Sequence, residues 1–176
     1  MANRATLELN GNFFESLIAS SLASAFPEAK VLHNLEVYSV FLKKNTQVDV
    51  LLVHPTGIFV IEAKNWTDWV RGGYNDRQWS GASNHGAPIT TRSPLDQNFL
   101  HVRTLKRAFR VYGYKPPTFY NLVVFPDGVN ITSDCKEVCT FTQIESRIRS
   151  LVLQAERKFR VESCVNVLRQ VAKEET

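Results

Sequence analysis

Two carboxylates and one lysine are spaced so that they could meet at one end of a short β-hairpin. Asp49, Glu62 and Lys64 lie in the stretch TQVDVLLVHPTGIFVIEAKNW, where two apolar runs typical of strands flank a turn of sequence HPTG. If Val53 pairs with Ile58 across this turn, Asp49 falls directly opposite Glu62. Directly opposed residues have Cβ atoms about 5 Å apart on one face, and Lys64 follows on that face about 7 Å farther along.

This arrangement would suit a divalent metal ion. Two carboxylates so close together repel each other unless a cation or a proton lies between them. A hard ion such as Mg²⁺ or Mn²⁺ accepts carboxylate oxygens and keeps positions for water and phosphate oxygens. An acid and a lysine near strand ends more often form a solvated pair. Here both acids interrupt runs too apolar for a one-sided surface strand, and a buried carboxylate needs a partner.

The segment around this hairpin resembles the core of the NERD (nuclease-related domain) family, a branch of the PD-(D/E)xK phosphodiesterase superfamily. The resemblance extends upstream to GNFFESLIASSL, which is similar to the opening G-x-x-x-E helix of the family. Downstream it includes WVRGGYNDRQW and SPLDQNFLHVRTL, where the family usually has Asn-Pro-x-x-Gln. It covers about residues 9–110. The chain departs from the pattern at Ser93, which replaces that asparagine, and at Asn12 and Phe13, where a second glycine is common.

The resemblance implies metal-dependent hydrolysis of phosphodiester bonds in nucleic acid, with DNA favoured over RNA. Lys64 would orient or help to deprotonate the attacking water, or would stabilise the developing negative charge. Gln97 would contact the scissile region or that water. The groups that would hold Mg²⁺ or Mn²⁺ are Asp49, Glu62, Glu15 and the main-chain carbonyl of Ala63. Without the resemblance, Glu15 is a first-turn carboxylate near the positive end of a helix dipole, and Gln97 is one more exposed glutamine.

Length and composition indicate a single globular domain. The 176 residues are 44% hydrophobic and 22% charged, and the net charge is +4. The apolar runs are too short to cross a bilayer, and the N-terminus lacks the apolar segment of a signal peptide. We therefore expect no membrane association and a cytoplasmic location. Cys135, Cys139 and Cys164 have no CxxC spacing, which favours reduced thiols over a zinc site.

The order of elements predicts an α/β (α+β mixed) fold: a restriction-endonuclease-like mixed central sheet with an antiparallel meander, flanked by helices. We expect one domain over residues 1–176, with a core at about 9–126 and C-terminal helices at about 142–174. Strands are expected at residues 35–42, around Asp49 and Glu62, at 119–126 and at 137–141. Residues 65–90 should form short strands and loops, in which the tryptophans pack more often than they stack on bases. The first helix, from about residue 7 or 12, should bury Phe14, Leu17, Ile18, Leu22 and Phe26.

A helix beginning at the cap Ser93 and Pro94 is expected to end near Gly113. Its apolar face should contain Leu95, Phe99, Val102, Leu105 or Lys106, and Phe109. Another face carries four cations that could follow a phosphate backbone, namely Arg103, Lys106, Arg107 and Arg110. An ordinary solvated face is the commoner use of such a stripe. A capping box at residues 142–145 should open a further helix, and the last helix should present Val161, Val165, Leu168 and Val171 on one side.

Two other functions remain open. A catalytically inactive nucleic-acid-binding or adaptor module could keep the same fold, and it would be recognised by the loss of a site residue. None of the expected site residues is missing from this chain. Paired carboxylates also serve in glycoside hydrolysis, but that reaction gives no role to Lys64. Because the sequence contains no specificity domain, a targeting partner protein or a homodimer is a further expectation.

Overall fold

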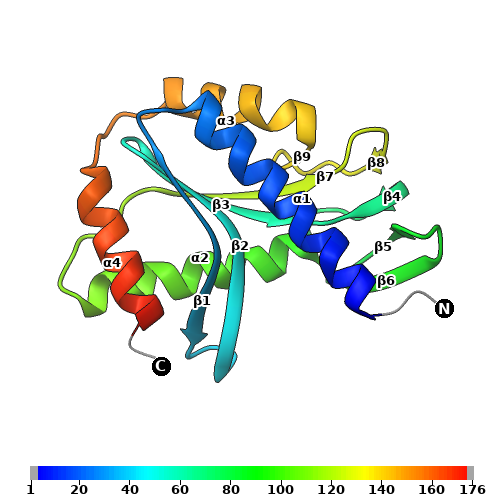
Figure 1. Ribbon diagram of the computed structural model, residues 1–176, viewed down its shortest axis with the longest axis horizontal. Coiled ribbons are helices and arrows are strands. Elements are labelled where there is room, and N and C mark those ends of the chain that lie inside the picture. The colour runs from blue at the N-terminus through cyan, green and yellow to red at the C-terminus, as the bar shows by residue number, and fades with distance from the viewer. Residues whose placement is uncertain (1–3, 174–176) are drawn as a thin grey trace.

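The computed structural model describes residues 4–173, which form a mixed α+β fold with two sheets and flanking helices (Figure 1). The larger sheet has the strand order β1-β2-β3-β7-β9 and comprises Lys30–Ser39, Lys44–His54, Gly57–Ala63, Phe119–Phe125 and Val138–Thr140. The smaller sheet has the order β6-β5-β4-β8 and comprises Pro88–Arg92, Gln78–Ser83, Trp66–Arg71 and Asn130–Thr132. The helices of this region are α1 (Arg4–Ala25), α2 (Pro94–Val111), α3 (Ile144–Leu153) and α4 (Val161–Lys173), with the 3-10 turn η1 (Phe141–Gln143) before α3.

The hairpin formed by β2 and β3 has the register expected from the sequence. Val53 pairs with Ile58, and His54 pairs with Gly57 on either side of the turn. β1 pairs antiparallel with β2 and completes the meander, whereas β7 and β9 join in parallel. The larger sheet is therefore mixed, as predicted. For the region of β4, β5 and β6, the sequence predicted only short strands and loops, and it did not predict that they form a sheet together with β8.

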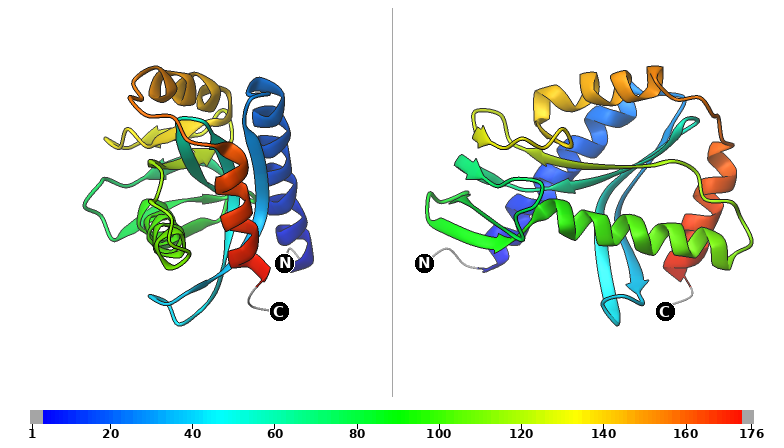
Figure 2. Two further views of the ribbon diagram at one scale, coloured as in Figure 1. Left: turned by 90° about the vertical axis from the view of Figure 1, so that its left-hand side faces the viewer. Right: turned by 180° about the vertical axis from the view of Figure 1, so that it is seen from behind.

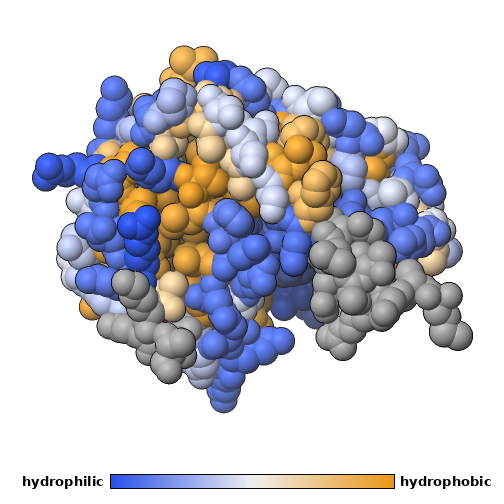
Figure 3. Space-filling model, viewed as in Figure 1, coloured by the Kyte–Doolittle hydropathy of each residue, from blue (hydrophilic) through white to orange (hydrophobic). Residues whose placement is uncertain are grey.

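Two layers of helices bury the faces of the larger sheet (Figure 2). α1 and α3 cover one face, and their core includes Phe14, Ile18 and Ile148. α2 and α4 cover the other face, where Leu105, Leu168 and neighbouring side chains pack against β1, β2 and β3. Between α1 and α4, apolar side chains reach the surface (Figure 3). Because both faces are covered, β3 is buried along almost its whole length, as its unbroken apolar sequence predicts.

Several boundaries and faces differ from the sequence-based expectation. β1 begins at Lys30, five residues early, because its pairing with β2 extends to Val53, and the chain after Ser39 turns instead of extending. Leu17 is 41% exposed, since α1 contacts the sheet through a narrower stripe that includes Ala19. The capping box joins Thr140 and Gln143 at η1, two residues before the expected position.

α2 begins and ends where the sequence predicts. The Ser93 hydroxyl accepts a hydrogen bond from the Asp96 amide, Pro94 is the first helical residue, and Gly113 follows the C-terminus with φ +75°. Its buried face is partly different, because Phe99 is 52% exposed. Polar side chains replace it against the sheet: Asn98, His101 and Thr104.

Tryptophans form the centre of the smaller sheet. Trp66 and Trp79 are buried there, as the packing interpretation predicts, whereas Trp69 is 40% exposed. Glycine allows this packing, because a Cβ on Gly72 would overlap the indole ring of Trp79.

Two further sequence expectations concern the cysteines and the membrane. Cys135, Cys139 and Cys164 are buried free thiols. Among the helices of residues 4–173, none combines the length and the apolar character that a membrane span requires.

We expect Gly72→Ala to lower the free energy of unfolding by about 1–3 kcal/mol, as overpacking does in a filled core. The adjacent Gly73→Ala is the matched control, because its nearest neighbour would be the Asp76 carboxylate at 3.3 Å, a flexible group at the surface. Chemical denaturation of both variants measures the difference. Equal stability of the two variants would mean that the indole ring does not constrain the backbone here.

Candidate active site

The open end of the β2–β3 hairpin holds the two expected carboxylates. The pairing of β2 with β3 reaches Val50 with Ile61, and Asp49 and Glu62 are the next residues of the two strands beyond this pair. Asp49 Oδ2 accepts a hydrogen bond of 2.9 Å from the Ala63 amide. The N–H and C=O groups of one strand residue point to the same side. The Ala63 carbonyl therefore faces the side on which Asp49 lies.

Lys64 connects β3 to α2. Its Nζ lies 2.6 Å from Glu62 Oε1 and donates a hydrogen bond of 3.1 Å to Gln97 Oε1. Glu62 is only 1% exposed, so this ion pair is its main compensation for burial. Gln97 lies in the first turn of α2, and the Ser93 cap fixes where that turn begins. Two segments distant in sequence thus meet at one ammonium group.

Glu15 approaches the same region from α1. Its Oε2 is buried and has no hydrogen-bond partner among the described residues. Burial first, and then the negative charge of Asp49, raise the pKa of Glu15 to about 7, against the opposing effect of Lys64. The charges of Asp49 and Lys64 thus act on the Glu15 carboxylate.

His101 is a component of the site that sequence reasoning missed. It lies one turn after Gln97 on α2 and is 2% exposed. Its Nδ1 lies 3.7 Å from Glu62 Oε2, and its Nε2 is 3.0 Å from the hydroxyl of Thr46 on β2. Burial, followed by the charge of Lys64, lowers the pKa of His101 to about 4, so the ring is neutral at pH 7. The i, i+4 spacing from Gln97 was the available signal.

The carboxylates are held in an environment that disfavours their charge. Burial and the neighbouring charge of Glu62 raise the pKa of Asp49 to about 7, although the Ala63 amide and Lys64 oppose the change. Burial also raises the pKa of Glu62. Glu62 Oε2 has no hydrogen-bond partner within the described part of the chain. The site therefore has an unmet requirement for positive charge or for a proton.

Comparison with known proteins assigns this chain to a family. The profile described as "Nuclease-related domain" (NERD) matches residues 10–126, which is more than half of the chain and includes every carboxylate of the site. This chain belongs to the NERD family. It is also similar to an uncharacterized protein of Bacillus anthracis, with 29% identity over 97 residues. That alignment covers 54% of this chain and 45% of the relative, so the chain spans less than half the length of that protein. No solved structure gives a significant match.

The potential metal ligands at this site are all oxygen atoms, which are the ligands that hard divalent cations prefer. They are carboxylate oxygens and one main-chain carbonyl, and two carboxylate oxygens are buried without hydrogen-bond partners. Within the residues described by the structure, no three or more His, Cys, Asp or Glu side chains are grouped so that they could hold a metal ion. Lys64 occupies one oxygen of Glu62 instead. Mg²⁺ commonly binds through only one or two carboxylates and keeps several waters, so the donor set fits such an ion.

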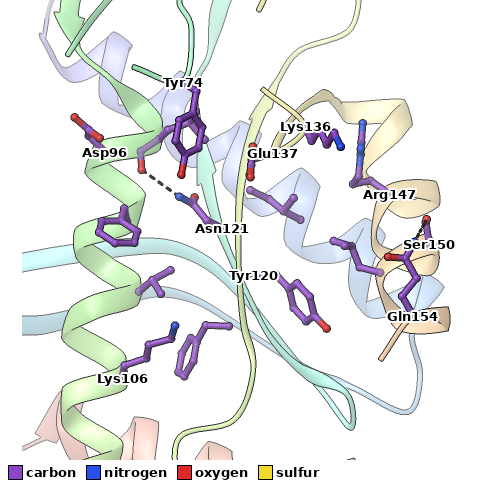
Figure 4. Close-up of a pocket in the computed structure, with 16 residues that line it drawn as sticks. Tyr74, Asp96, Lys106, Tyr120, Asn121, Lys136, Glu137, Arg147, Ser150 and Gln154 are labelled. Carbon is purple, nitrogen blue, oxygen red and sulfur yellow. Dashed lines mark hydrogen bonds between the residues drawn. The ribbon is translucent and has the colours of Figure 1, made fainter. Parts of the chain in front are cut away.

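The expected nucleic-acid-binding residues lie away from this centre. Arg103, Arg107 and Arg110 are exposed on the outer face of α2, and Lys106 is partly buried beside them. They do not contact the carboxylates. A separate cavity of about 700 Å³ lies between α2 and α3, with Asp96 and Lys106 on one wall and Arg147 on the other (Figure 4). This cavity is distinct from the carboxylate site, because its lining contains none of the side chains of Asp49, Glu62, Lys64 and Gln97.

We expect Asp49→Asn to flatten the pH dependence of unfolding in metal-free, chelator-containing buffer. The pKa of Asp49 is about 7 in the folded protein and about 4 in an unfolded chain. The protonated form therefore stabilises the fold below about pH 4, and that stability is lost as the pH rises through about 7. The wild-type melting temperature should fall over this range more steeply than that of the variant.

Asp127→Asn is the control for this experiment. The pKa of Asp127 is lowered by hydrogen bonds, of which the one from the Thr142 amide has the largest effect. Asp127 is therefore ionised above about pH 5 in both the folded and the unfolded protein. This control should keep the wild-type slope. Identical slopes for wild type and Asp49→Asn would show that the Asp49 carboxyl is not disfavoured by its surroundings.

Proposed function

We propose that this chain is a metal-dependent nuclease that hydrolyses phosphodiester bonds of nucleic acid, DNA in preference to RNA. The observation that carries the proposal is the meeting of Asp49, Glu62, Lys64 and Gln97 at one end of a buried hairpin, within the segment that matches the NERD family. Glu15, Asp49, Glu62 and the Ala63 carbonyl are the proposed ligands of Mg²⁺ or Mn²⁺. When bound, such an ion lowers the pKa of a coordinated water and neutralises charge on the phosphate.

The remaining groups of the chain would position the reactants. In the hydrolysis, a water oxygen forms a bond to phosphorus and loses a proton to solvent, while one P–O ester bond breaks and its leaving oxygen takes up a proton from solvent. The Lys64 ammonium, held by Glu62 and Gln97, would stabilise negative charge that develops on the phosphate oxygens. Gln97 would hold Lys64 in place and present its amide to the attacking water. Thr46 would hold His101, whose ring lies beside the second oxygen of Glu62.

A catalytically inactive nucleic-acid-binding or adaptor module is the second candidate. It would keep the cations of α2 without needing the carboxylates. The retention of two buried carboxylate oxygens without hydrogen-bond partners favours the enzyme, because an inactive module gains stability when such groups are replaced. The proposed setting is cytoplasmic, which the three free thiols favour. A partner protein or a second copy of the chain would provide targeting.

The first experiment separates metal binding from cleavage. We expect Mg²⁺ or Mn²⁺ to raise the melting temperature of the wild-type protein, since saturation at about 100 times Kd adds about 2.7 kcal/mol of stability. Glu62→Gln should lose both this shift and cleavage of plasmid, linear duplex or single strands. In chelator it should melt at or above the wild-type temperature, because one of the repelling charges is gone.

Glu145→Gln provides a matched control. Glu145 lies on α3, where it pairs with Arg149 at the surface, and its replacement should leave the metal-induced shift and cleavage unchanged. Cleavage by Glu62→Gln at the wild-type rate would remove Glu62 from the proposed ligands. A metal-induced shift without cleavage of any substrate would favour the inactive module.

The second experiment tests the cations of α2. Replacing Arg103, Arg107 and Arg110 together by glutamine should weaken nucleic-acid binding and flatten its salt dependence. Each lost phosphate contact removes about 0.9 from the slope on duplex DNA and about 0.7 on single strands. The turnover at saturating substrate should change much less, because the carboxylate site is intact.

A triple variant with the same loss of charge controls for net charge. Arg157, Arg160 and Arg169 are exposed on or next to α4, and their replacement by glutamine should leave the salt slope unchanged. Equal slopes for the two triple variants would mean that the stripe on α2 is an ordinary solvated surface.

A further inference from the structure

The outer face of α2 contains a groove whose chemistry is more specific than a row of positive charges. A hollow of about 510 Å³ is lined by Phe41, Phe99, Arg103, Lys106, Arg107, Arg110 and Val111. No acidic side chain belongs to this lining. Within the described residues, none of its cations forms an ion pair with a carboxylate. The groove therefore offers uncompensated positive charge to a polyanion.

One wall of the groove is the tip of the β1–β2 hairpin. Figure 2 shows this hairpin extending past α2. The Thr104 hydroxyl donates a hydrogen bond of 3.0 Å to the buried Ser39 hydroxyl, which fixes the hairpin to α2 where the tip begins. Phe41 follows at the tip and lies under the Arg103 guanidinium, 4.2 Å from its ring centroid. The wall is thus held in place and is not a free loop.

The groove exposes two phenylalanine rings among its cations. Phe41 is 41% exposed and Phe99 is 52% exposed, although Phe99 occupies a position that helical periodicity assigns to the core. Single exposed apolar residues are ordinary. Two rings that line one cationic groove, one of them already stacked against an arginine, form the combination that binds bases by stacking and phosphates by charge.

We propose that this groove binds single-stranded nucleic acid, with unpaired bases stacked on Phe41 and Phe99 and phosphates bound by the four cations. A duplex keeps its bases stacked inside, so its backbone could use the cations but not the rings. Arg103 lies six residues after Gln97, which corresponds to about 9 Å along the helix. A strand bound in the groove would therefore lie along the same helix that carries Gln97 in its first turn.

A second hollow extends this surface toward the beginning of α2. It measures about 440 Å³ and is lined by Arg77, Gln78, Arg92 and Asp96. Two further cations thus lie beside Asp96 in the first turn of α2, where Gln97 contacts Lys64. The inference rests on the proposed function and specifies its substrate class as strands with unpaired bases.

Binding is measured in chelator, so that it does not depend on cleavage. The full chain is titrated into a short fluorescent thymidine oligonucleotide, its RNA counterpart, a duplex of the same length, and an abasic strand with the same number of phosphates. We expect the single strands to bind more tightly than either the duplex or the abasic strand. The DNA and RNA strands distinguish which sugar the groove prefers.

Phe41→Ala and Phe99→Ala should each weaken single-strand binding about fivefold or more, which corresponds to the loss of one stacked base. Their affinity for duplex and abasic strands should stay at the wild-type value. Leu153→Ala, which removes an 86% exposed apolar side chain from α3, is the control and should have no effect. Phe41→Trp should retain binding, and its added indole fluorescence should be quenched by the single strand, as stacking requires.

Three results would overturn the inference: duplex binding as tight as single-strand binding, equal competition by the abasic strand, or wild-type single-strand affinity in both alanine variants. Thermal unfolding of each variant establishes that it is folded. The two proposals fail separately. Single-strand binding by a protein that cleaves nothing with Mg²⁺ would remove the nuclease function alone, whereas metal-dependent cleavage without any effect of the phenylalanines would remove only the single-strand groove.

Discussion

The burial of the Glu62 carboxylate is the constraint on which the rest of this structure depends. A carboxylate 1% exposed inside a sheet destabilises the fold by several kcal/mol unless it is paired or protonated. Lys64 pairs with one oxygen, and His101 lies near the other at a distance too long for a hydrogen bond. The chain thus compensates Glu62 only in part. Burial is the first cause of the raised pKa of both Asp49 and Glu62, and for Asp49 the neighbouring charge of Glu62 adds to it.

Three elements must be placed correctly for this compensation to exist. The register of β2 and β3 brings Asp49 to the Ala63 amide. If one strand slipped by one residue, the carboxylates of Asp49 and Glu62 would lie on different faces of the sheet. The start of α2 at Ser93 places Gln97 and His101 one turn apart, so that one contacts Lys64 and the other faces Glu62. α1 adds Glu15 from the opposite face of the sheet. A shift of any of these elements would leave a buried charge without its partner.

α2 links the chemistry of the site to recognition. Its inner face contacts the sheet through polar groups, and Asn98 donates hydrogen bonds to main-chain carbonyls of both β3 and β7. These bonds join the helix rigidly to the strand that carries Glu62. Its outer face carries the cations and Phe99 of the groove. Under the proposed function, a polyanion bound on the outer face would be held in a fixed relation to the carboxylates, as hydrolysis requires.

The sequence by itself determined the hairpin and the limits of α2. A tight turn between two apolar runs allows one register, because strand side chains alternate with a period of two, and Ser93-Pro94 and Gly113 are local signals for helix ends. Only the tertiary structure decided that His101, Asn98 and Thr104 are buried while Phe99 is exposed. Helical periodicity identifies a face, but the neighbours of that face come from distant segments. Here those neighbours are Glu62, the carbonyls of β3 and β7, and Ser39, which bind polar side chains and would leave a phenylalanine opposite unsatisfied polar groups.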